Sequence, residues 1–159
     1  MASDVSAKTV LTDPVHFWAF GFGAGLAPLA PGTVGTAVGV FLDFAIRNLA
    51  FPVRLAVVVV LFLAGIWICG ESARRLREHD HPGIVWDEIV GYMAAMLVAP
   101  PGWIWALCGF FLFRAFDIFK PWPIRDVDHR ITGGLGIMLD DILAAAYTAI
   151  LLGSARLFV

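Results

Sequence analysis

An apolar run at residues 53–70 constrains the fold of this chain most, because no charged residue follows Arg54 within it. Its centre reads VVVVLFLAGIWI, and its length approaches the roughly 20 residues that a helix needs to cross a bilayer. The whole chain is similarly apolar, since 60% of its residues are hydrophobic and 15% are charged, with a mean hydropathy of +0.83. Ordinary globular proteins are about 45–50% apolar and about 25% charged. The sequence therefore predicts a small, multi-span, helical membrane protein.

Four other apolar segments have the length of helices and complete the prediction of an all-α fold with about five apolar helices. These segments cover about residues 34–50, 84–99, 103–119 and 138–153. In the first of them, Asp43 and Arg47 are spaced to form an ion pair on one helix face. Residues 1–14 are polar and carry no cleavable signal peptide, and we expect them to be flexible. The length of 159 residues suits a single domain, 1–159.

The basic residues predict how such a protein lies in the membrane. If every apolar segment crosses, tight turns at 51–53 and 100–102 share one side, and the remaining loops share the other. The second side carries most of the basic residues, namely Lys8, Arg74, Arg75, Arg77, Lys120, Arg125 and Arg130. Since cytoplasmic loops are enriched in Lys and Arg, this side is predicted to face the cytoplasm. The polar motifs described next lie on the same side.

The first polar motif is HDHPGIVWDE, residues 79–88, at the start of the third apolar segment. Asp87 and Glu88 are candidate metal ligands, and Asp80 and Asp87 are candidate catalytic groups. Neighbouring residues on a helix point about 100° apart, so one acid could bind a metal while the other orients it. The alternative is a helix N-terminus whose acids only complement the macrodipole.

The second motif places Arg114, Asp117 and Lys120 three residues apart, along one predicted helix face. Asp117 is a candidate metal ligand. Arg114 and Lys120 are candidates to bind a substrate phosphate, because guanidinium and ammonium groups suit phosphate oxygens. A simple ladder of ion pairs within the helix is the alternative. Arg125, in the predicted loop 117–136 that follows, is a further candidate for binding phosphate.

The third motif is GGLGIMLDD, residues 133–141, before and into the last apolar segment. Its glycines would let the backbone approach a ligand closely where a helix begins, so Gly134 is a candidate phosphate-binding residue. Asp140 and Asp141 are candidate metal ligands, and Asp141 is also a candidate catalytic group. The glycine-rich and proline-rich loop 21–36 precedes the first apolar segment. In it, Thr33 is expected to cap the helix and to contact phosphate.

The candidate ligands are all carboxylates, which predicts Mg²⁺ as the cofactor, with Mn²⁺ as the second choice. They are Asp80, Asp87, Glu88, Asp117, Asp140 and Asp141. Cys69 and Cys108 lie within apolar runs, where buried thiols are the expected reading. The chain has no basic run or stripe of aromatic and basic residues, so no nucleic-acid partner is predicted.

Together these motifs resemble the phosphatidylglycerophosphatase A family of bacterial membrane lipid phosphatases. The resemblance runs through GFGAGLAPLAPGTVGT, HDHPGIVWDEIVG, FRAFDIFKPWPIR and GGLGIMLDD, and it covers about residues 16–150. It implies Mg²⁺-dependent hydrolysis of phosphatidylglycerophosphate to phosphatidylglycerol and phosphate, at the bacterial inner membrane, by a mostly helical protein. The motif residues that it implies are Pro31, Gly32, Thr33, Asp80, Trp86, Asp87, Glu88, Arg114, Asp117, Lys120, Pro121, Pro123, Gly133, Gly134, Gly136, Asp140 and Asp141.

Other membrane proteins with acidic motifs are the alternatives. The DGxxAR core of CDP-alcohol phosphotransferases is absent, and so are the KxxxxxxRP and SGH motifs of histidine-based lipid phosphatases. A small transporter or channel component would place its acids at mid-membrane depth, whereas most acids here lie near segment ends. The nucleophile is open between an activated water and an aspartate that forms a phosphoenzyme.

Overall fold

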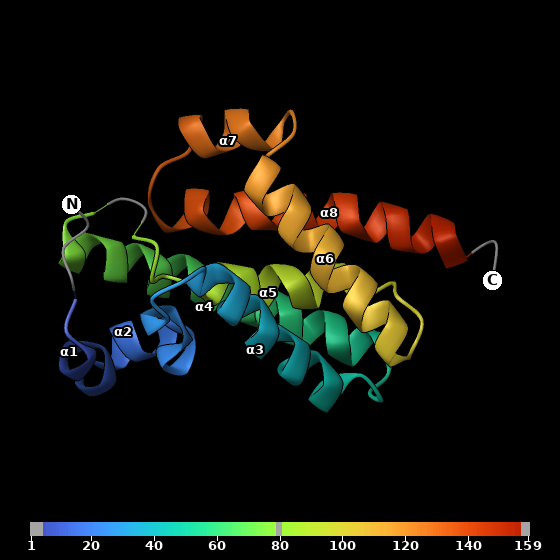
Figure 1. The fold of residues 1–159 in the computed structure, drawn as a ribbon, viewed down its shortest axis with the longest axis horizontal. Coiled ribbons are helices and arrows are strands. Elements are labelled where there is room, and N and C mark those ends of the chain that lie inside the picture. The colour runs from blue at the N-terminus through green and yellow to red at the C-terminus, as the bar shows by residue number, and fades with distance from the viewer. Residues whose placement is uncertain (1–4, 79–80, 157–159) are drawn as a thin grey trace.

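The computed structural model describes residues 5–78 and 81–156, and within these ranges every regular element is a helix (Figure 1). This confirms the all-α prediction. The elements are α1 (Ala7–Thr12), α2 (Pro14–Ala19), the 3₁₀ helix η1 (Gly21–Leu26), α3 (Pro31–Ile46), α4 (Phe51–Leu76), α5 (Trp86–Ala95), α6 (Trp103–Phe119), α7 (Ile124–Arg130) and α8 (Gly133–Ala155).

The short helix α5 forms the centre of the molecule, and α3, α4, α6 and α8 pack around it (Figure 1). One face of α5 contributes Ile89 and Met93 to a core shared with α4 and α8. The opposite face contributes Tyr92 to a second core, where it meets Phe113 of α6 and Ala144 of α8. Because almost all of its residues are buried, α5 holds its side chains in fixed positions between the two longest helices.

Only one predicted helix has the predicted bounds, which is α6 at 103–119. The helix predicted at 34–50 begins instead at Pro31, whose fixed φ suits a first helical position. Its N-cap is Ala30 in a left-handed conformation, so the prediction that Thr33 caps this helix is wrong. The helix predicted at 53–70 extends through its charged end to Leu76, because Glu71 pairs there with the two arginines that follow it.

The predicted number of membrane-crossing helices is not confirmed. Among the described residues, two helices are long and apolar enough to cross, α4 and α8. The segment predicted at 84–99 contains α5, whose ten residues rise about 15 Å, half the thickness of a bilayer's hydrocarbon core. Sequence hydropathy cannot separate a helix buried in protein from one buried in lipid, and α5 is of the first kind.

The connections between the helices fall into two groups, as the sequence predicts (Figure 1). The α3–α4 and α5–α6 connections lie at one end of the bundle. The α4–α5 connection and the segment between α6 and α8 lie towards the other. That last segment was predicted to be a loop, 117–136, but it contains α7 and the first turn of α8. A short helix escapes a reading of apolar periodicity because it has too few turns to show one.

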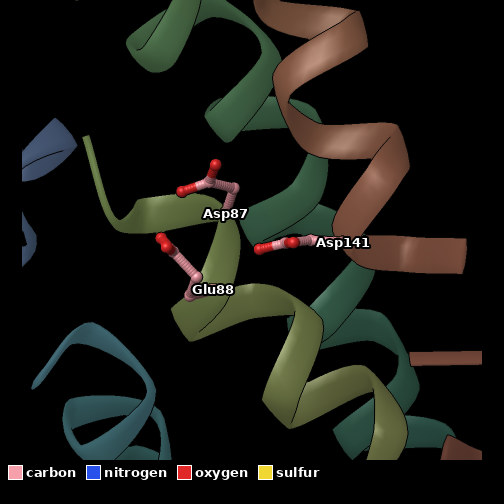
Figure 2. A group of neighbouring side chains, drawn as sticks. All are labelled: Asp87, Glu88 and Asp141. Atoms are coloured by element: carbon pink, nitrogen blue, oxygen red, sulfur yellow. The ribbon is translucent and has the colours of Figure 1, made fainter. Parts of the chain in front are cut away.

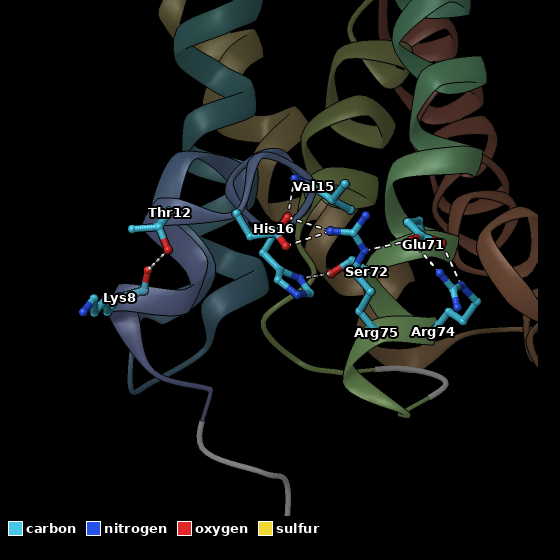
Figure 3. Close-up of polar contacts among 9 residues, drawn as sticks. Lys8, Thr12, Val15, His16, Glu71, Ser72, Arg74 and Arg75 are labelled. Atoms are coloured by element: carbon cyan, nitrogen blue, oxygen red, sulfur yellow. Dashed lines mark hydrogen bonds and ion pairs between the residues drawn. The ribbon is translucent and has the colours of Figure 1, made fainter.

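The N-terminal segment is helical from Ala7 onward, although residues 1–14 were expected to be flexible. Asp13 accepts hydrogen bonds from the backbone N–H groups of Val15 and His16 and so caps α2. The same carboxylate pairs with Arg75 near the end of α4, at 2.7 Å (Figure 3). Nearby, His16 Nδ1 lies 2.9 Å from the buried hydroxyl of Ser72. These contacts tie the first two helices to α4.

A buried ion cluster joins the helices at the end where α3 meets α4. The predicted pair of Asp43 and Arg47 is confirmed, and Asp43 is fully buried. Arg54 of α4 lies 3.2 Å from the second carboxylate oxygen and also donates to the carbonyl oxygen of Met96 at 2.8 Å. Arg47 donates in turn to the carbonyl oxygen of Gly102. One carboxylate therefore links α3 and α4 to the α5–α6 connection.

Candidate metal and phosphate site

A pocket of about 250 Å³, called the acid pocket below, lies where α3, α5 and α8 meet the end of α6. It is lined by Ala30, Pro31, Gly32, Pro82, Ile84, Asp87, Glu88, Arg114, Asp117, Lys120, Asp140 and Asp141. The lining includes five carboxylates and two basic groups, so the described residues give it an excess of negative charge.

The carboxylates of the acid pocket form two overlapping groups. Oxygen atoms of Asp87, Glu88 and Asp141 lie within 4.8 Å of one another, and Figure 2 shows these three side chains converging. Oxygens of Asp117, Asp140 and Asp141 form a second group with the same limit. Asp141 belongs to both groups. The structure therefore brings together acids from three helices that are far apart in the sequence.

Helix α8 begins earlier than predicted, and this determines where two of these acids lie in the helix. The sequence predicts Asp140 and Asp141 at the start of a helix at 138–153, but α8 begins at Gly133, so they lie about two turns inside it. Both are buried. Asp141 faces Gly91 of α5, where an added Cβ would lie 3.0 Å from the Cβ of the aspartate. The glycine thus allows the close approach of α5 and α8 that brings the two acidic groups together.

The two basic groups of the pocket are held by carboxylates. Arg114 Nη1 lies 2.5 Å from Asp117 and 3.5 Å from Glu88. Lys120 Nζ lies 2.6 Å from Asp140. The prediction that all three residues lie along one helix face is wrong for Lys120, which lies beyond the end of α6. It adopts a left-handed conformation, with φ at 42°, and turns toward α8.

The first turn of α3 closes the pocket on the side facing Glu88. A Cβ atom at Gly32 would lie 2.1 Å from Glu88 Oε1 and 3.0 Å from Arg114 Nη1, so only glycine fits there. The N-terminus of this 16-residue helix carries a partial positive charge, which suits an anion. Pro31 has no N–H, and the N–H groups of Thr33 and Val34 donate to the carbonyl oxygen of Ala30, so Gly32 supplies the N–H of this turn. The sequence predicts an anion site at the start of the last helix. In the structure the start of α3 lines the pocket, and the first two residues of α8 are not among the described lining residues.

Burial changes the ionisation of the acids on α5, which lies outside the two candidate spans. Burial raises the pKa of Asp87 well above its usual range, and the negative charges of Glu88 and Asp141 raise it further. Burial, reinforced by the charge of Asp117, raises the pKa of Glu88 to about 7, although a hydrogen bond with Asp87 and the charge of Arg114 oppose this. Both carboxylates are thus poorly stabilised as anions by the protein alone.

The pocket has the donors that a hard divalent cation requires. Among the described residues, Asp87 Oδ1, Glu88 Oε2 and Asp141 Oδ2 are buried without a hydrogen-bond partner. Buried charged oxygens without partners are costly, and a bound cation would satisfy them. Clustered carboxylate oxygens with no sulfur or imidazole ligand suit Mg²⁺ rather than zinc or copper. The residues therefore fit the cofactor that the sequence predicts.

Three of the predicted site residues that the structure describes do not line the pocket. Gly134 lies against α4, where an added Cβ would be 1.8 Å from the carbonyl oxygen of Ile66, so it serves the packing of two helices. Thr33 lies in the first turn of α3, and Arg125 is exposed on α7; neither is among the described lining residues. Asp80 lies outside the described residues.

Some lining residues were not predicted to be part of a site. Ala30 was not predicted, and Gly32 was named only as a motif residue of the family resemblance, because this stretch was predicted to be a loop before the helix. The signal that could have found them is Ala-Pro-Gly, since proline at the first helical position starts a helix there.

Comparison with known proteins gives the family. A family model described as Phosphatidylglycerophosphatase A matches residues 17–156. The chain belongs to this family. No solved structure matches the chain.

Three relatives extend this result. Proteins named Phosphatidylglycerophosphatase A from Escherichia coli (strain K12) and Haemophilus influenzae are 38% and 42% identical to the chain over 144 and 145 residues. Each match covers 90% of this chain, with 84% of the first relative and 89% of the second. A Bacteroides thetaiotaomicron protein, provisionally named phosphatidylinositol-3-phosphatase, is 39% identical over 144 residues, which cover 86% of this chain and 89% of that protein.

Membership in the phosphatidylglycerophosphatase A family makes the chain a phosphatase and disfavours the alternative of a transporter or channel component. The resemblance read from four motifs is thereby confirmed. The bacterial relatives and the apolar helices also indicate a membrane protein.

Proposed function

We propose that this chain removes the terminal phosphate of phosphatidylglycerophosphate in the acid pocket, giving phosphatidylglycerol and phosphate. The observation that carries the proposal is the meeting of five carboxylates with Arg114 and Lys120 in one pocket. The names of the Escherichia coli and Haemophilus influenzae relatives support the choice of substrate. The Bacteroides relative is named for a different headgroup, and the chemistry common to all three names is phosphate release from an anionic lipid.

Mg²⁺ is the cofactor that we propose. Asp87, Glu88 and Asp141 would hold one ion, and Asp117 and Asp140, with the shared Asp141, offer a second set of oxygens. When bound, Mg²⁺ neutralises charge on the phosphate and lowers the pKa of a water. The protein's part is to hold these carboxylates together, despite their mutual repulsion and the cost of burial, through the close packing of α5 on α8.

Arg114 and Lys120 are the side chains that we propose to bind the substrate phosphate. Both line the pocket, and each is held in place by an ion pair, with Asp117 and Asp140 respectively. Preformed pairs of this kind reduce the reorganisation that substrate binding requires. The first turn of α3 would add the backbone N–H of Gly32 and the partial positive charge of the helix N-terminus.

For the chemical step we propose that an activated water attacks the phosphorus atom. Asp141 belongs to both carboxylate groups and Asp87 to the first, and these two are the candidates to orient this water and to accept its proton. Asp80 remains a prediction from the sequence. Trapping of a phosphate bound covalently to an aspartate during turnover would contradict the choice of water.

We further propose that the chain is a multi-pass protein of the bacterial inner membrane whose acid pocket faces the cytoplasm. Two helices, α4 and α8, have the length and composition to cross. The excess of Lys and Arg near the pocket side supports the orientation. A diacyl lipid leaves the bilayer at great cost, so its phosphatase needs a site at headgroup depth. Basic residues there attract anionic lipid, at roughly 1 kcal/mol each.

The test is release of phosphate from phosphatidylglycerophosphate in detergent micelles, with Mg²⁺ and with EDTA. We expect activity only with Mg²⁺. We expect Asp87→Asn, Asp117→Asn and Asp141→Asn each to lose about 100-fold or more, the scale at which metal ligands and their supports act. Asp126→Asn, in an exposed position on α7, is the matched control and should retain full activity. Full activity in EDTA, or in all three pocket variants, would contradict the metal site.

A further inference from the structure

A second pocket, called the loop chamber below, adjoins the acid pocket. It has a volume of about 450 Å³ and lies between residues 25–28 and residues 81–83, with Val5, Phe20 and Pro31 completing its wall. Pro31 and Pro82 line both pockets. The two pockets therefore adjoin at these two prolines, and the acid pocket is the smaller and more polar of the two.

The walls of the loop chamber are fixed by close backbone contacts. A Cβ at Gly25 would lie 1.9 Å from the carbonyl oxygen of Gly83, and a Cβ at Gly83 would lie 2.3 Å from the ring of Phe20. The N–H of Gly25 donates to the carbonyl oxygen of Phe20 at 2.9 Å. His81 accepts from the N–H of Gly83 at Nδ1, which holds its ring beside Phe20. The shape is thus preformed rather than the result of a loosely packed loop.

The chemistry of the loop chamber differs from that of the acid pocket. Among the described residues that line it, none carries a formal charge at neutral pH, apart from His81 when protonated. Its surface combines apolar side chains with backbone groups. Such a lining suits a small, hydroxyl-bearing, uncharged group rather than a second phosphate or a metal ion.

A phosphate held by Arg114 and Lys120 must leave the rest of the substrate in an adjoining space. The loop chamber is the space that shares lining residues with the acid pocket. The wall between the two is the start of α3, where Ala30 has a left-handed conformation before Pro31. With the phosphate in the acid pocket, the part of the substrate bonded directly to it would extend past the start of α3 into the loop chamber.

Resting on the proposed function, we propose that the loop chamber binds the glycerol that carries the departing phosphate and so determines which lipid headgroup is accepted. Residues 25–28 are then specificity-determining for the reaction, although they contribute no charge to it. Ala27 has the smallest side chain in this stretch apart from glycine, and enlarging it would fill the chamber without changing the acid pocket.

The experiment compares Ala27→Val and Ala27→Phe with the wild-type protein in Mg²⁺. Leu29→Phe is the matched control, because Leu29 is 83% exposed in the same loop and is not among the described chamber residues. Two quantities are measured for each: KM for phosphatidylglycerophosphate, and inhibition by inorganic phosphate, which occupies the acid pocket alone. We expect Ala27→Phe to raise KM about tenfold and Ala27→Val to raise it less. The inhibition constant for inorganic phosphate should stay within about twofold of the wild-type value in every variant.

Three results would overturn the inference. One is an unchanged KM in Ala27→Phe, with phosphate inhibition intact. Another is a parallel loss of substrate binding and phosphate inhibition already in Ala27→Val, which would mean that the loop only supports the acid pocket. The third is a rise in KM for the dipalmitoyl substrate that is absent for the dioctanoyl substrate. That result would mean that the chamber binds an acyl chain. Absence of phosphate release by the wild type would instead contradict the proposed function, and the inference would fall with it.

Discussion

Gly32 is the residue whose replacement most directly tests the shape of the acid pocket. We expect Gly32→Ala to lower kcat/KM about 100-fold, because its methyl group would displace the Glu88 carboxylate or Arg114, and small displacements in a site have effects of this size. Phosphate release measures the loss, and thermal unfolding in detergent checks that the variant folds.

The control for this substitution is Gly153→Ala, because an added Cβ at Gly153 in α8 meets nothing within 4 Å. It should leave activity unchanged and raise stability slightly, since alanine favours a helix by about 0.5–1 kcal/mol over glycine. Equal activities of the two variants would show that the space around Gly32 does not matter.

The burial of Glu88 predicts a dependence of stability on pH in protein without metal. Its pKa rises from an ordinary 4.5 to about 7, so the folded state binds this proton more tightly than the unfolded state. The contribution to stability is present while the carboxyl is protonated, and it is lost as pH rises from about 4.5 through about 7. In EDTA, the thermal midpoint should fall over that range.

Two comparisons check the cause of this pH dependence. Mg²⁺ should reduce the fall, because it stabilises the ionised carboxylates, and Glu88→Gln should reduce it in EDTA by removing the titrating group. An identical fall in Glu88→Gln would assign the effect to other groups.

At the scale of the elements, the ion cluster of α3 and α4 predicts that replacing its carboxylate with an uncharged side chain greatly lowers stability. Asp43→Asn would leave the buried Arg54 and the half-buried Arg47 without their carboxylate. Removing one partner of a buried pair costs about 3–5 kcal/mol, which we expect to see in unfolding by denaturing detergent. Phosphate release at low temperature should persist, because the cluster lies at the end of the bundle away from the acid pocket.

Glu71→Gln is the matched control for this element. Its partner Arg74 is 73% exposed, and exposed ion pairs contribute about 1 kcal/mol or less. If both substitutions had the same small effect, the buried cluster would not hold α3 to α4.

The elements also show what the sequence could and could not predict. The acids on α5, α6 and α8 were found because charges stand out in apolar segments. The length of α5 was not predicted, since protein and lipid surround a helix with equally apolar groups. The role of Gly134 was misread because glycine that allows two helices to touch looks the same in sequence as glycine that makes room for a ligand.

At the scale of the whole molecule, the proposed orientation predicts which positions are accessible from outside the cell. In a chain with Cys69 and Cys108 replaced by alanine, Arg77→Cys should react with a membrane-impermeant maleimide only after lysis. Pro101→Cys, exposed at the opposite end of the bundle, should react in intact spheroplasts. The reverse pattern would place the acid pocket outside the cytoplasm.

In the proposed multi-pass topology, the order of the helices along the chain affects how α8 would enter the membrane. Asp140 and Asp141 lie inside α8, and an aspartate at the centre of a crossing helix adds about 2.5–3.5 kcal/mol to the cost of insertion. During synthesis α8 leaves the ribosome after α5 and α6, which carry the groups that surround these two acids. The earlier helices can therefore shelter the aspartates at the translocon, and α8 attached to a foreign protein should insert less efficiently than α8 in its own chain.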